Sequence, residues 1–135
     1  MKYWLLKTEP GNYSWDDLMK DGHTFWDGVR NYAARNFMKE MKKGDLAFIY
    51  HSVKEREIIG IAEISKEHYQ DPTTDDDRWV AVDIKPYKKL KKSVNLDQVK
   101  ADDRLKDMAL VKISRLSVQP VKQEEFDIII AMSES

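Results

Sequence analysis

Cysteine is missing from this sequence, and so are long apolar runs. Without cysteine the chain has no disulfide, no thiolate for a metal and no cysteine nucleophile, and a zinc deaminase, which needs cysteine ligands, is excluded as well. No apolar stretch approaches the roughly 20 residues of a membrane span. The apolar run within residues 1–10 is too short for a signal peptide. We therefore expect a soluble, cytoplasmic protein with no membrane partner.

Glycine and histidine are scarce, with 5 and 3 residues. The chain has neither a glycine-rich phosphate loop nor a G-x-S-x-G nucleophile turn. The histidines His23, His51 and His68 lie far apart and lack the spacing of metal ligands. Asp16 and Asp17 are adjacent, so on a helix they diverge, as first-turn acids do. We expect no metal and no cofactor.

The length and charge of the chain limit its class further. Its 135 residues, 41% of them hydrophobic, fit one folded domain spanning residues 1–135. The net charge of −1, from 23 basic and 24 acidic residues, argues against a simple polycation that binds nucleic acid by charge alone. The charge is uneven, because residues 71–77 (DPTTDDD) are acidic and residues 85–92 (KPYKKLKK) are basic. Both runs are typical of solvated surface, although the basic run could also contact a phosphate backbone.

Periodicity and capping signals predict an α+β fold. Strands are predicted at residues 2–7, 45–52, 57–65 and 78–87, with a short extended segment at 116–121. Helices are predicted at residues 14–22, 31–41, 95–102 and 122–132, the first three capped by Ser14, Asn31 and Asn95. The strands at 45–52 and 57–65 should form a hairpin over the turn 53–56. Strands outnumber helices and do not alternate with them regularly, which favours a small curled sheet with helices packed outside.

Two strands carry more specific expectations. Leu46, Phe48 and Tyr50 should face one side of their strand, and Ala47, Ile49 and His51 the other. Gly60, inside the next strand, indicates a bulge or a close backbone approach. In the final helix the buried side should hold Phe126, Ile129 and Ile130.

The segment TFWDGVRNYAARN, residues 24–36, concentrates a tryptophan beside planar hydrogen-bonding side chains that bury poorly without partners. Two other clusters accompany it. Lys7, Thr8 and Glu9 end the first strand, where an ordinary surface ion pair is the alternative reading. Residues 50–52 (YHS) end another strand, a place where binding residues are common.

Four segments together resemble the EVE domain family. They occur in the same order and at natural spacing between Tyr3 and about Ile130: WLLKTEP, FWDGVRNYAARN, IIGIAEI following IYHS, and DMALVKISRLSVQPV. The resemblance implies a PUA-like small curled β-barrel with flanking helices, similar to YTH domains, which take a methylated base into an aromatic pocket. It also implies a non-enzymatic module that binds RNA or DNA through a modified base, with modified cytosine expected for EVE domains.

By that resemblance Trp26 supplies a stacking face and Gly28 allows a close approach to the ligand. Asn31 and Ser52 bond the base edge, while Arg30 and Arg35 hold phosphates. The full set of implied ligand-binding residues is Lys7, Thr8, Trp26, Val29, Arg30, Asn31, Tyr32, Arg35, Tyr50, His51, Ser52, Arg115, Leu116 and Ser117.

The sequence departs from the family pattern at two positions. Ala33 stands where the family usually has glutamine, which bears on ligand choice, and Lys122 replaces a frequent threonine cap. A second aromatic wall of the pocket has no clear match; Tyr32, Tyr50 and Trp79 are the candidates.

Two other functions fit the same residues. The neighbouring ASCH family contains amidohydrolases that use Thr, Lys and Glu, so Lys7, Thr8 and Glu9 could act on an N-acylated cytidine, with Lys7 as base and Thr8 as nucleophile. Strand alternation opposes this, because it sends Lys7 and Thr8 to opposite faces. A small-molecule sensor is the third possibility. We expect nucleic acid as the partner and a monomer.

Overall fold

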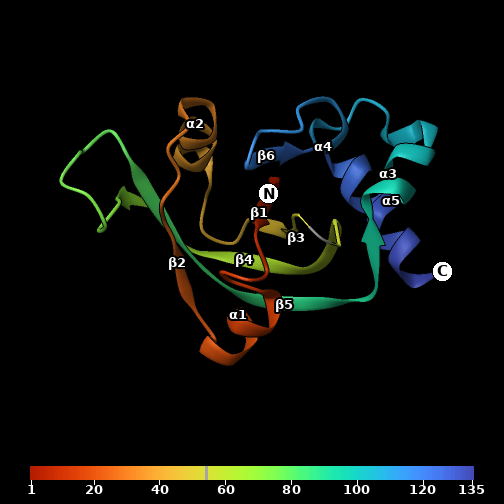
Figure 1. The fold of residues 1–135 in the computed structure, drawn as a ribbon, viewed down its shortest axis with the longest axis horizontal. Helices are drawn as coiled ribbons and strands as arrows, with labels where there is room; N and C mark the ends of the chain where they lie inside the picture. Colours follow the sequence, from red (N-terminus) through yellow and green to blue (C-terminus); the bar gives the residue numbers. More distant parts are fainter. Residues whose placement is uncertain (54) are drawn as a thin grey trace.

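Six strands of the described residues form one curled sheet with helices packed on both faces (Figure 1). The structure, a computed structural model, describes residues 1–53 and 55–135. The strands are β1 (Tyr3–Thr8), β2 (Thr24–Trp26), β3 (Leu46–His51), β4 (Glu57–Gln70), β5 (Val80–Asn95) and β6 (Val118–Val121). The helices are α1 (Trp15–Asp21), α2 (Tyr32–Glu40), α3 (Leu96–Ala101), α4 (Ala109–Lys112) and α5 (Gln123–Glu134), with a 3-10 turn η1 (Asp103–Leu105).

The strand order is β2-β5-β4-β3-β1-β6. β1 and β3 run parallel, and the other paired strands are antiparallel. The predicted α+β class with a curled sheet and flanking helices is confirmed. The barrel is not closed, because within the described residues the edge strands β2 and β6 do not pair with each other.

The alternation predicted for β3 is confirmed, and it separates two cores. Leu46, Phe48 and Tyr50 pack with residues of α3, α4 and α5 on one face of the sheet. Ala47 and Ile49 pack with residues of α1 and α2 on the other. Because both faces of β3 are covered, this strand lies at the centre of the molecule and fixes the positions of β1 and β4 beside it.

The predicted helix caps are confirmed. Ser14 and Asp17 form a reciprocal capping box at α1, which ends at Gly22 with φ 73°. Asn31 caps α2, its side chain accepting a hydrogen bond from the Ala34 N–H, and Asn95 caps α3. A cap of this kind is typically worth about 1 kcal/mol. The caps Ser14 and Asn31 determine where α1 and α2 begin, on either side of β2.

Gly60 shows both features that the sequence predicts for it, a strand irregularity and a close approach to a neighbouring group. The pairing of β3 with β4 and of β4 with β5 shifts register next to it. A Cβ at Gly60 would lie 2.8 Å from ring atoms of Trp15, so the absent side chain makes room for this indole. The close neighbour is a side chain and not the backbone. This contact seats α1 against the sheet.

Several elements differ from the sequence prediction. β2 was not predicted, since three residues carry too little periodicity and its pairing with β5 is a tertiary contact. β5 continues through the basic run 85–92, because Leu90 and Val94 still point into a core while the lysines face solvent. The predicted turn 53–56 includes Lys54, which lies outside the described residues. Within the described residues no helix is long and apolar enough to span a membrane.

Candidate functional site

A cavity of about 430 Å³ lies beside the end of β1, β2 and the segment that precedes β6. This volume falls within the roughly 300–1,000 Å³ of typical small-ligand sites. The lining residues are Lys7, Thr8, Glu9, Asn12, Tyr13, Thr24, Phe25, Trp26, Asp27, Gly28, Val29, Arg30 and Ser117. Six residues of the predicted site are therefore brought together here: Lys7, Thr8, Trp26, Val29, Arg30 and Ser117.

Aromatic rings form part of the cavity wall. Trp26 is half-buried, and Tyr13 meets its ring edge-on with centroids 6.4 Å apart. Phe25, 44% exposed, adds a third ring. Sequence reasoning missed Tyr13 and Phe25. Tyr13 lies in the loop between β1 and α1, where no periodic pattern indicates a site residue. The Thr8 hydroxyl donates to the Tyr13 carbonyl at 2.6 Å, and this bond holds that loop against the end of β1.

Another part of the wall is polar. Lys7 donates from its backbone N–H to the Ser117 carbonyl at 2.9 Å, and from Nζ to the Ser114 carbonyl at 2.6 Å. Burial lowers the pKa of the Lys7 ammonium below its ordinary value. Lys7 and Thr8 both line the cavity, but their side chains leave β1 on different faces, as strand alternation predicts. Lys7 Nζ lies 5.8 Å from the centroid of the Tyr50 ring on one face. The Thr8 hydroxyl bonds Tyr13 on the other.

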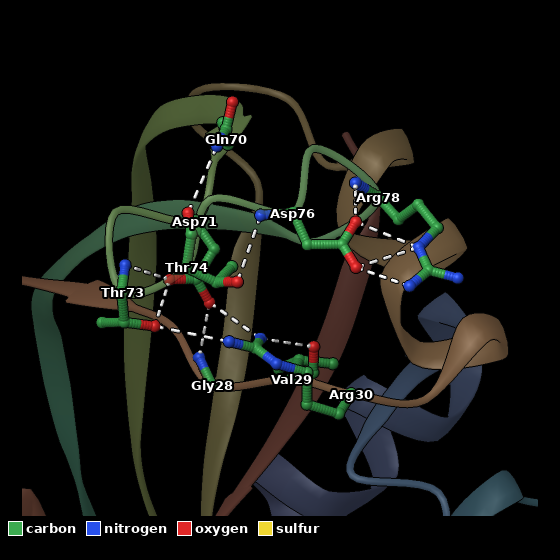
Figure 2. A network of polar contacts seen from close by, with 9 residues as sticks. All are labelled: Gly28, Val29, Arg30, Gln70, Asp71, Thr73, Thr74, Asp76 and Arg78. Carbon is green, nitrogen blue, oxygen red and sulfur yellow. Dashed lines mark hydrogen bonds and ion pairs between the residues drawn. The ribbon is translucent and has the colours of Figure 1, made fainter.

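The turn after Trp26 is held by a buried carboxylate (Figure 2). Asp71 is fully buried, and its Oδ2 accepts from the Gly28 N–H at 2.8 Å and from the Arg30 guanidinium at 3.0 Å. Its Oδ1 accepts from the backbone N–H of Thr73 at 2.7 Å and from the Thr73 hydroxyl. Gly28 has φ 73°, which explains the glycine without reference to a ligand.

Hydrogen bonding also sets the ionisation of Asp71. Burial alone would raise its pKa, but the donors from Thr73, Gly28 and Arg30 together lower it to about 2. Sequence reasoning treated the run 71–77 as solvated surface and missed this residue. The signal was the segment DPTT directly after a strand, because an aspartate that accepts from the N–H two residues later forms an Asx turn.

A cluster of rings and guanidinium groups lies next to the cavity, between α2 and the segment before β5. Tyr32, 51% exposed, lies 5.1 Å from Trp79 between ring centroids. Arg35 lies 5.0 Å over the Tyr32 ring, and Arg30 lies 5.6 Å over the Trp79 ring. Arg78 donates to the Tyr32 hydroxyl at 3.1 Å. Neither Tyr32 nor Trp79 lines the cavity, whose rings beside Trp26 are Tyr13 and Phe25.

The predicted strand-end residues 50–52 do not line the cavity. Tyr50 is 3% exposed and belongs to the core below α5. His51 accepts a hydrogen bond on Nε2 from the Trp15 N–H at 3.0 Å, and burial lowers its pKa. Ser52 donates to the Thr8 carbonyl from both its N–H and its hydroxyl. Their role as ligand contacts stays a prediction.

Three further predicted residues also lie outside the cavity wall. Asn31 is occupied as the cap of α2, Leu116 is buried in a core, and Arg115 is exposed. For metals, residues 1–53 and 55–135 contain no group of three or more His, Cys, Asp or Glu side chains placed to hold an ion.

Comparison with known proteins identifies the family. The EVE domain model matches residues 2–132. Thymocyte nuclear protein 1 of Gallus gallus is 39% identical over 166 aligned residues, which cover 98% of this chain and 69% of the chicken protein. The NMR structure of Rpa0253 from Rhodopseudomonas palustris, 50% identical, has a TM-score of 0.95 and covers 99% of this chain and 94% of that one.

A second solved structure carries a ligand. The crystal structure of human THYN1 protein in complex with 5-methylcytosine-containing DNA has a TM-score of 0.94 at 36% identity. The likeness covers 100% of this chain and 99% of that one. The family model and these relatives span nearly the whole sequence, and the chain is a member of the EVE domain family.

Proposed function

We propose that this chain is a DNA-binding module that takes a modified base, 5-methylcytosine, into the cavity beside Trp26. The main observation behind the proposal is that aromatic rings and polar groups line the same cavity of about 430 Å³. The human relative crystallised with 5-methylcytosine-containing DNA supports the choice of DNA and of this base.

The cavity wall has the two kinds of surface that a base requires. The half-buried indole of Trp26 offers a stacking face, and stacking of a base on an aromatic ring is worth about 1–3 kcal/mol. Lys7 and Ser117 lie on the polar part of the wall, where they can meet a base edge. A base inside a duplex would have to leave the helix to reach these groups, so the proposal includes base flipping.

Phosphate contacts do not require a basic protein. Arg35 has no acidic partner among the described residues, and its guanidinium lies on the exposed cluster next to the cavity. A few such contacts would position the strand without carrying sequence information. This agrees with a net charge of only −1.

The amidohydrolase reading is less well supported by the contacts of the same wall. A threonine nucleophile needs a base that accepts its proton, within about 2.6–3.2 Å. The Thr8 hydroxyl instead donates to the Tyr13 carbonyl, and Lys7 Nζ donates to the Ser114 carbonyl. If the protein released cytidine from N4-acetylcytidine, the amidohydrolase function would be favoured over the binding module.

Competition titrations with matched oligonucleotides test the proposal. Single- and double-stranded DNA, and RNA of the same sequence, would carry cytosine, 5-methylcytosine or 5-hydroxymethylcytosine at one central position. We expect DNA with a modified cytosine to bind about 10- to 200-fold more tightly than plain cytosine, which is the usual value of one carbon in an apolar site. Equal affinity for all three bases would overturn the proposal, and a preference confined to RNA would overturn the choice of DNA.

A further inference from the structure

Two half-buried charged side chains in the cavity wall lack an ion-pair partner. Asp27 follows Trp26 directly, and Lys7 lies near the end of β1. Within the described residues, neither forms an ion pair with the other or with a third group, and no hydrogen bond to the Asp27 carboxylate is present. A half-buried carboxylate that lines a cavity without a partner is available to a ligand there.

The other charged residues of the wall are already satisfied or lie at its exposed side. Arg30 is neutralised by the buried Asp71 at 3.0 Å. Glu9 is exposed and accepts from the Asn12 side chain at 3.2 Å. Lys7 Nζ already donates to the Ser114 carbonyl at 2.6 Å. Asp27 is therefore the charged residue of the wall for which the described residues provide no partner.

We propose that Asp27 is a specificity-determining residue, which accepts a hydrogen bond from the exocyclic amine of the bound base. The proposal rests on the function proposed above. It adds the reason why the cavity accepts a 4-amino pyrimidine and rejects a 4-keto pyrimidine.

The chemistry of the Asp27 side chain decides the direction of the preference. An ionised carboxylate only accepts hydrogen bonds. The Watson–Crick edge of cytosine presents an amine donor at its first position, which matches this acceptor. Thymine presents a carbonyl oxygen and an N–H donor at the first two positions, so it would place oxygen against the Asp27 carboxylate. A buried polar mismatch of this kind costs more than a missing methyl group.

A comparison of 5-methylcytosine with thymine isolates this effect. Both bases carry the same methyl group at C5, so recognition of the methyl group cannot separate them. In otherwise identical DNA strands, we expect wild-type protein to prefer 5-methylcytosine over thymine by at least about 100-fold. In Asp27→Asn the amide can either accept or donate, so the ratio should fall below about 10-fold, mainly because thymine binds more tightly.

Asp75→Asn is the matched control, because Asp75 is exposed, lies outside the cavity wall and loses the same charge. It should keep the wild-type ratio. Equal binding of 5-methylcytosine and thymine by wild-type protein would overturn the inference even if Asp27→Asn did not fold. If that result came with a clear preference for 5-methylcytosine over cytosine, the proposed function would stand. An unchanged ratio in folded Asp27→Asn would also overturn the inference.

Discussion

Trp26 carries the largest share of the proposed base contact. It is the last residue of β2, which pairs Trp26 with Val82 of β5. Its ring packs against the core on one side and lines the cavity on the other. The residue is thus positioned by a strand, while part of its indole stays available to a ligand.

Trp26→Ala should remove binding to 5-methylcytosine DNA while the protein remains folded. The ring is only half-buried, so its loss should cost less than the roughly 3–5 kcal/mol of a fully buried aromatic residue. Thermal melting and fluorescence polarisation would measure both effects. Tyr87→Ala, which removes a 57% exposed ring outside the cavity wall, is the control and should bind normally. An unfolded Trp26→Ala would show that this residue belongs to the core.

Arg30 and Arg35, both predicted to hold phosphates, have different surroundings. The charge of Arg30 is paired with buried Asp71, so Arg30 mainly holds the cavity wall. Arg35 has hydrogen bonds to Asn36 and to the Arg78 carbonyl but no ion pair among the described residues. Only Arg35 keeps a charge that a phosphate could neutralise.

Arg35→Ala should weaken binding equally for modified and unmodified single strands. Loss of one phosphate contact should reduce the slope of log K against log salt by about 0.7. Affinity measured over a series of salt concentrations tests this, with Arg104→Ala as control, since Arg104 is exposed and paired with Asp102 outside the cavity wall. An unchanged slope would contradict a phosphate role for Arg35.

At the scale of elements, the segment that joins β4 to β5 determines the shape of the cavity wall. Asp71 begins this segment and holds Gly28 and Arg30, which lie 43 and 41 positions away in sequence. Figure 2 shows its carboxylate between these donors and Thr73. The ionised carboxylate accepts all four hydrogen bonds, and protonation would weaken them. We therefore expect these contacts of the cavity wall to be lost in acid.

Asp71→Asn should lower the free energy of unfolding and change its dependence on pH. Because the folded pKa of about 2 lies below the ordinary value of 3.8, ionised Asp71 stabilises the fold above about pH 4, and this stability is lost as the pH falls towards 2. The contribution is about 2 kcal/mol. Denaturant titrations from pH 7 to pH 2.5 should show the difference between wild type and Asp71→Asn shrinking in acid. A difference that stays constant with pH would contradict the role given to Asp71.

The sequence predicted elements well where a local signal exists. The caps Ser14, Asn31 and Asn95 and the alternation in β3 are local, and each is found in the structure. β2 was missed, because its strand character comes from pairing with β5 and not from its own three residues. For Asp71 only the bonds from Thr73 are local, and the donors Gly28 and Arg30, which make it a structural residue of the wall, are distant in sequence.

At the scale of the whole molecule, the curled sheet brings distant segments to one cavity. Residues from β1, from the loop before α1, from β2 and from the turn before β6 meet there. The resemblance predicts Trp26 and Lys7 as site residues, and both line the cavity. It also predicts Tyr50, His51 and Ser52, which do not line it. Adjacency in a motif does not reveal which side chains share a cavity, because that depends on the curvature of the sheet.

The basic residues 85–92 form a charged surface away from the cavity. The basic run 85–92 lies in the middle of β5, and β2 pairs with the residues just before it, 82–84. None of the lysines of this run lines the cavity. The run therefore offers a second surface that could attract DNA by charge, and a test of the account must separate binding there from binding beside Trp26.

Photocrosslinking makes that separation most directly. A DNA strand with 5-iodocytosine at one position would be bound, irradiated and digested, and the crosslinked peptide would be sequenced by mass spectrometry. Iodine occupies the position of the methyl group, so the reactive carbon should lie against the cavity wall. We expect crosslinks to Tyr13, Phe25 or Trp26, which competition with 5-methylcytosine DNA should suppress. Crosslinks to Tyr87 or to the lysines of residues 85–92 would contradict it.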